Sequence, residues 1–101
     1  MSLTNTAYAM DDRIIRSNVW YVCDDPTAVY AEGYTQTRTE YHYTNVELDD
    51  IGGSSFSIRS GRKFGWGKVS AKTRKVNWRT EASGDFPYGV LAITKVYYGF
   101  K

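Results

Sequence analysis

Residues 34–48 read YTQTRTEYHYTNVEL, and this stretch decides the fold. It is rich in Thr and Tyr and contains neither Gly nor Pro, which is typical of a long β-strand. Tyr41 and Tyr43 lie on one face of such a strand, whereas Val46 and Leu48 lie on the other. Because the apolar face changes sides along the stretch, the pattern predicts a strand with a bend or bulge near its middle.

Strand patterns extend outward from this stretch in both directions, and turn signals at residues 24–26, 49–53 and 61–62 separate them. Gly33 is expected to end a short strand, and Gly61-Arg62 to form a tight hairpin turn. Gly65 and Gly67 indicate a bulge, or a close approach by another backbone or a ligand. The last segment is apolar on both faces, which predicts a central strand. The expected strands besides 34–48 are residues 18–23, 27–31, 54–60, 63–72, 73–80 and 89–100.

With 101 residues, nine Tyr, four Phe and three Trp, the chain is predicted to form a single all-β domain over residues 1–101. We expect an antiparallel β-sandwich of about six or seven strands. No stretch approaches the roughly 18–20 apolar residues of a membrane span. Met1-Ser2-Leu3 is typical of a cloning leader ahead of a mature N-terminus, and residues 1–10 are expected to be an extended arm. We therefore expect a secreted protein whose signal peptide has been removed; a cytoplasmic protein with a native start is the alternative.

The sequence carries no catalytic or cofactor signature, so we expect a protein that is not an enzyme and uses no cofactor. It holds one histidine and one cysteine and no GxSxG elbow. Cys23 is interpreted as a small buried residue, and His42 as a strand residue facing water or a hydrogen bond. Glu40 and Glu47 fall on opposite strand faces, which disfavours a glycosidase pair. No metal site is predicted, because the paired aspartates at the turns lack the spacing of an EF-hand loop.

Charge is distributed unevenly along the chain. Residues 1–50 hold nine acids and three bases, net −6, whereas residues 51–80 hold eight bases and no acid, net +8. The bases of this second block alternate with aromatic residues, a combination that can grip a polyanion while stacking on its rings. The predicted ligand-binding residues are Arg62, Lys63, Trp66, Lys68, Arg74, Lys75 and Trp78.

A different interpretation of the same block remains open. Its bases would line solvent faces of paired strands and meet the acids of residues 1–50 across the sheet, since opposite charges often pair between strands. In that case Trp66 and Trp78 would be core residues. The block lacks an RNP-like motif, so no specific nucleic-acid partner is expected. The expected partners are an anionic cell-wall polymer or polysaccharide, or a second copy of the chain in a homo-oligomer.

Three segments carry a resemblance to a known family. They are residues 30–48 (YAEGYTQTRTEYHYTNVEL), residues 61–73 (GRKFGWGKVSAKT) and the element Tyr97-Tyr98-Gly99-Phe100. Together they resemble small secreted β-sandwich proteins of Gram-positive bacteria, of the lactococcin 972-like bacteriocin type. The resemblance covers about half of the chain and rests on residue character; this chain is longer and has an additional N-terminal segment. It implies a secreted protein directed at the cell envelope, and no individual functional residue carries over.

The leading hypothesis from the sequence is thus a secreted, non-enzymatic module that binds a surface or a polyanion. A bacteriocin-like antagonist acting at the cell envelope is one alternative. A self-associating structural protein, whose acidic half pairs with the basic half of a neighbour, is the other.

Overall fold

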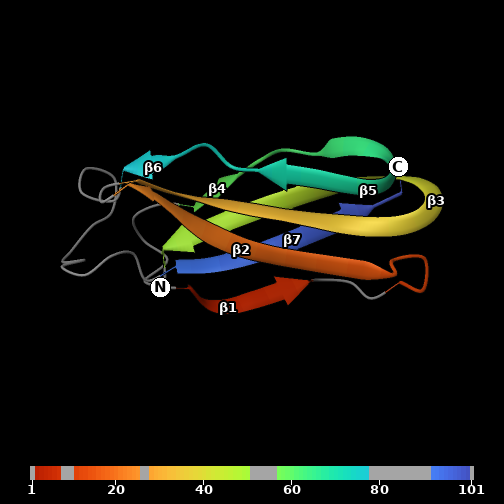
Figure 1. Ribbon diagram of the computed structural model, residues 1–101, viewed down its shortest axis with the longest axis horizontal. Coiled ribbons are helices and arrows are strands. Elements are labelled where there is room, and N and C mark those ends of the chain that lie inside the picture. The colour runs from red at the N-terminus through yellow and green to blue at the C-terminus, as the bar shows by residue number, and fades with distance from the viewer. Residues whose placement is uncertain (1, 8–10, 26–27, 51–56, 78–91, 101) are drawn as a thin grey trace.

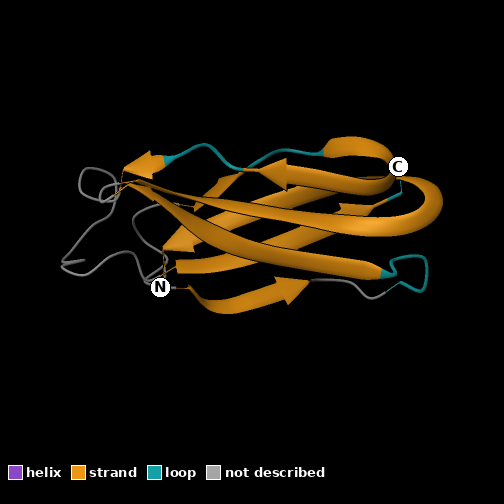
Figure 2. Cartoon of the chain, in the orientation of Figure 1, coloured by secondary structure: helices purple, strands orange, loops and turns teal. Residues whose placement is uncertain are grey.

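A computed structural model describes residues 2–7, 11–25, 28–50, 57–77 and 92–100. Within these ranges the chain consists of strands joined by turns and contains no helix (Figures 1 and 2). The all-β prediction is therefore confirmed. The strands are β1 (Ser2–Ala7), β2 (Arg16–Asp25), β3 (Ala28–Asp50), β4 (Ser57–Arg59), β5 (Lys63–Lys72), β6 (Val76–Asn77) and β7 (Ala92–Gly99).

All of these strands belong to one continuous sheet. Its order is β1-β7-β3-β2, and β4, β5 and β6 pair with β3 as well. β1 runs parallel to β7, whereas every other pairing is antiparallel. The two separate sheets of the expected sandwich are not confirmed, because hydrogen bonds connect every strand. β7 lies between β1 and β3, which confirms the prediction that the last strand is central.

β3 folds back on itself near its middle, as the change of apolar face predicted (Figure 1). Its pairing with β5 jumps from Gln36 to Tyr41, which leaves residues 37–40 as the bend. The first arm of β3 pairs with β2, and the second arm pairs with β7. The predicted end of a strand at Gly33 is wrong, because β3 runs through it. A Cβ at Gly33 would lie 2.7 Å from the backbone oxygen of Asn18, so the glycine lets β2 approach closely.

β5 follows the bend of β3 and pairs with both of its arms. The turn in β5 falls at Gly67, whose φ of 69° lies in the left-handed region that glycine adopts without strain. Of the two outcomes predicted for the strand glycines, a bulge is found at Gly67, which the pairing of β5 with β3 skips. The hairpin predicted at Gly61-Arg62 is wrong, since β4 and β5 both pair with β3 and not with each other.

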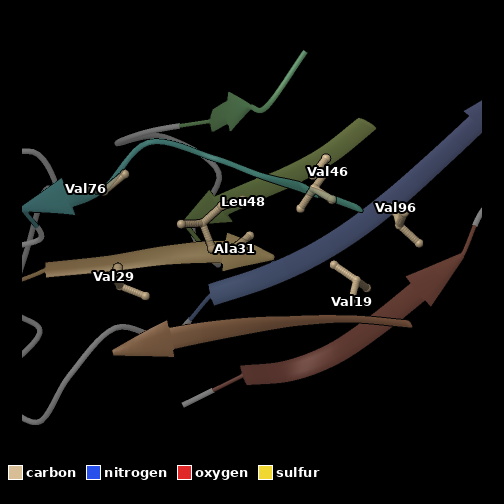
Figure 3. Packing of buried hydrophobic residues seen from close by; sticks show 8 residues of the cluster. Val19, Val29, Ala31, Val46, Leu48, Val76 and Val96 are labelled. Atoms are coloured by element: carbon tan, nitrogen blue, oxygen red, sulfur yellow. The ribbon is translucent and has the colours of Figure 1, made fainter. Parts of the chain in front are cut away.

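The interior is apolar at one end and polar at the bend. Figure 3 shows the apolar part, in which side chains from β2, β3, β6 and β7 meet. At the bend, Thr35, Thr37, His42 and Thr44 are all buried. Both ring nitrogens of His42 lie near backbone oxygens, 3.1 Å from that of Glu40 and 3.2 Å from that of Thr35. The buried cluster consists of Val19, Val29, Ala31, Val46, Leu48, Ala71, Val76 and Val96.

Two buried threonines connect the arms of β3 across this polar end. The hydroxyl of Thr44 donates to the backbone oxygen of Val69 at 2.8 Å, and the Oγ1 atoms of Thr35 and Thr44 lie 2.6 Å apart. Because a hydroxyl has a single proton, Thr44 must accept from Thr35. The result is a directed chain of hydrogen bonds from the first arm of β3 through the second arm to β5.

We expect Thr44→Val to lower the free energy of unfolding by about 1–3 kcal/mol, because the mutation leaves the buried Thr35 hydroxyl and the Val69 oxygen without this partner. Urea unfolding of Thr35→Val, Thr44→Val and the double variant measures the coupling. The double variant should lose less than the sum of the single losses. Thr39→Val, at an exposed position of the bend, is the control. Strictly additive losses would contradict the proposed hydrogen-bond chain.

Candidate functional site

The predicted ligand-binding residues fall into separate groups in the structure. Lys63, Arg74 and Lys75 line hollows along the free edge of β5, together with Lys72. Arg62 and Trp66 lie on an aromatic face formed by β3 and β5. Lys68 lies over the ring of Tyr34, with its Nζ 4.4 Å from the ring centroid. Trp78 lies outside the described residues.

Two cationic hollows lie along the edge of β5 that pairs with no other described strand. β5 folds over at Gly67, so Lys63 near its start lines the same hollow as Ser70, Ala71 and Lys72 near its end. A second hollow is lined by Tyr30, Thr73, Arg74, Lys75 and again Lys72. Each has a volume of about 460 Å³. We call this surface the basic edge; its cations are Lys63, Lys72, Arg74 and Lys75.

The cations of the basic edge differ in their surroundings. Neither Lys63 nor Lys72 forms an ion pair with an acidic side chain in the described part of the chain. Glu32 lines the first hollow and stands opposite Lys72 in the strand register, without coming within ion-pair distance of it. The Nζ of Lys72 lies 5.8 Å from the centroid of the Tyr30 ring. Both hollows hold more cations than acids, which suits an anionic ligand.

The aromatic face has two cross-strand pairs, Tyr41 with Trp66 and Tyr43 with Phe64. The rings of Tyr41 and Phe64 stack at 5.6 Å, and Arg62 lies 4.5 Å from the Tyr43 ring. Trp66 is 67% exposed, so the interpretation of this tryptophan as a core residue is wrong. Its exposure follows from the bend, which turns this face of β5 away from the core.

The alternative interpretation, in which the basic block pairs with the acidic half, holds at Arg59. Glu47 is almost fully buried and accepts a hydrogen bond of 2.7 Å from Arg59. Lys95 lies 3.6 Å from the same carboxylate and 3.5 Å from that of Asp49. The hydrogen bond from Arg59 to Glu47 raises the pKa of Arg59, and burial raises the pKa of Tyr97, whose hydroxyl donates to Glu47. Arg59 therefore has a structural role in this cluster.

Another acid is bound within its own segment. Asp11 accepts hydrogen bonds from the backbone N–H and the guanidinium of Arg13, which lower the pKa of Asp11 to about 2. The same guanidinium lies 3.5 Å from the centroid of the Phe100 ring. This contact joins the segment before β2 to the C-terminal end of the chain.

The described residues offer no arrangement for nucleophilic or metal chemistry. His42 is buried, and its ring contacts backbone oxygens and the ring of Phe100. Cys23 is exposed, so its predicted burial is wrong. No three His, Cys, Asp or Glu side chains among the described residues cluster closely enough to hold a metal ion. The same part of the chain has no helix of the length and apolarity needed to cross a membrane.

Some residues of the basic edge were absent from the predicted set. Tyr30 and Glu32 come from the first arm of β3, far from the basic block in sequence. Only their alternation with buried Val29 and Ala31 marks them as outward-facing. Lys72 belongs to the basic block, and its position at the end of β5 makes it common to both hollows.

Comparison with known protein families, with curated proteins and with solved structures finds no match to this chain.

We expect Arg13→Gln to raise the pKa of Asp11 from about 2 toward its ordinary value of 3.8. Since the folded state holds this pKa below the unfolded one, the pair stabilises the fold above pH 3.8, and this contribution is lost as the pH falls toward 2. Carboxyl-detected NMR titration of both proteins measures the shift, with the exposed Arg16→Gln as control. The same Asp11 pKa in wild type and Arg13→Gln would refute the contact.

Proposed function

We propose that this protein is a secreted, non-enzymatic binding module that takes an anionic cell-wall polymer or polysaccharide along the basic edge. One observation carries the proposal. Lys63 and Lys72, from opposite ends of β5, line one hollow, and neither is neutralised by a described acid. A chain of phosphate or carboxylate groups could supply the missing counter-charge to both.

The geometry of the edge supports a polymeric ligand. The two hollows share Lys72, so they follow one another along the strand. Beside these cations lie Tyr30 and the exposed Ser70, which offer a ring and a hydroxyl to a sugar or glycerol backbone. Among the described strands β5 pairs only with β3, and the hollows lie along its other edge.

We expect the pure protein to cosediment with Gram-positive cell walls at low salt. Binding should fall steeply with added salt, and also when the walls are stripped of teichoic acid, because the attraction is electrostatic. In Lys63→Gln/Lys72→Gln, the slope of log affinity against log salt should be shallower by about two, one for each removed cation.

The matched control is Arg38→Gln, which removes a cation at the exposed bend outside the basic edge and should reduce wall binding much less. Absence of binding under every condition would overturn the proposal, as would equal losses in both variants. Sedimentation equilibrium of the free protein completes the test. A mass that rises with protein concentration and falls in the double variant would instead assign the edge to self-association.

A further inference from the structure

The end of the molecule where β3 and β5 both turn carries a second exposed surface, distinct from the basic edge. The backbone N–H of Ile15 donates to the oxygen of Gln36 at 2.8 Å. In the strand register Gln36 lies between Arg16 and Lys68. Tyr41 and Trp66 form the first pair beyond the bend, and Arg38 lies within the bend. We call this surface the bend tip; it consists of Ile15, Arg16, Arg38, Tyr41, Trp66 and Lys68.

The bend tip concentrates exposed apolar area. Ile15 is 52% exposed, Tyr41 46% and Trp66 67%. The other large exposed hydrophobic side chain among the described residues, Phe64, stacks directly on Tyr41. Single exposed apolar side chains are common on protein surfaces, but Tyr41, Phe64 and Trp66 contact one another, and such a group marks an interaction surface.

The bend tip also carries three cations, of which Lys68 lies over the ring of Tyr34. Arg16, Arg38 and Lys68 form no ion pair with an acid of the described residues. Of the neighbouring acids, Asp11 is paired with Arg13, whereas Glu40 lies within the bend and accepts from the backbone N–H of Thr39. Exposed rings and an aliphatic side chain beside unneutralised cations match a membrane interface with anionic headgroups.

Ring orientation favours a bilayer over a ligand that stacks flat on the protein. Tyr41 already contacts two other rings, stacked on Phe64 and tilted by 55° against Trp66 at 5.2 Å. A flat sugar or base needs a free ring face, whereas a bilayer needs only accessible apolar area. Ile15, which has no ring to stack, adds accessible apolar area at the same end of the molecule.

We propose that the bend tip docks on the surface of an anionic phospholipid membrane. Trp66, Tyr41 and Ile15 enter the interfacial layer, and Arg16, Arg38 and Lys68 contact lipid phosphates. This goes beyond binding of a wall polymer, because it uses a different surface and a different ligand. The elongated shape, 44 × 19 × 18 Å, allows contact through one end while the basic edge along the side stays accessible.

Flotation with vesicles of phosphatidylglycerol and phosphatidylcholine tests the proposal. We expect binding to the mixed vesicles and little to pure phosphatidylcholine. Arg38→Gln should weaken it about fivefold, since a cation near an anionic surface contributes about 1 kcal/mol. Trp66→Ala should weaken it about tenfold. Lys63→Gln/Lys72→Gln, the control at the basic edge, should retain most of it.

Quenching of tryptophan fluorescence by brominated lipids measures directly whether Trp66 contacts the lipid. Fluorescence should be quenched in the wild type and much less in Trp66→Phe, which keeps Trp20 and Trp78. Vesicle binding that is unchanged in Trp66→Ala, or lost mainly in Lys63→Gln/Lys72→Gln, would overturn the proposal. So would binding of soluble oligothymidylate or dextran sulfate that depends on Trp66 while vesicles are ignored. Because the wall and vesicle assays use each other's variants as controls, failure of one proposal is distinguishable from failure of the other.

Discussion

The hydrogen bond between the buried hydroxyls of Thr35 and Thr44 joins the two arms of β3 across the interior, and the rest of the structure depends on that closure. β3 pairs with β2, β4, β5, β6 and β7, so its path sets the path of nearly every other strand. A straight strand of 23 residues could not bring these partners around one core. Folding β3 over lets the buried valines of both arms pack together. The buried polar side chains at the bend form hydrogen bonds with each other or with backbone oxygens. No buried side-chain nitrogen or oxygen among the described residues lacks a hydrogen-bond partner.

The exposed surfaces are consequences of the same bend. β5 must turn where β3 turns, and Gly67 permits this with a positive φ. Its two arms then converge on a shared hollow, which brings Lys63 near Lys72. At the turn itself the aromatic pairs face outward. The basic edge and the bend tip thus share β5 but differ in chemistry, one cationic and hollowed, the other apolar with a cationic rim.

The uneven charge distribution has a structural explanation only in part. Glu47 and Asp49 in the acidic half meet Arg59 and Lys95, and Asp11 meets Arg13 within its own segment. Arg59 belongs to the basic block, so the expectation that acids and bases pair across the sheet holds at that position. It does not hold for Arg62, Lys63, Lys68 or Lys72, which form no ion pair with a described acid; three of them lie near tyrosine rings. Sequence alone could not separate these cases, since strand register decides which charges face one another.

The sequence by itself determined the all-β class, the bounds of β5 and the bend in β3, and it narrowed the strand glycines to a bulge or a close approach. Each follows from local chemistry: β-branched and aromatic residues suit a pleated strand, a shift in alternation marks a bend, and glycine tolerates positive φ. Only the tertiary structure decided that Gly33 continues a strand, that β4 and β5 do not form a hairpin, and that Trp66 is exposed. It also decided that the basic block divides between an edge, an aromatic face and the bend tip. These outcomes depend on which strands pair and in what register, and that choice is made by contacts between residues far apart in the chain.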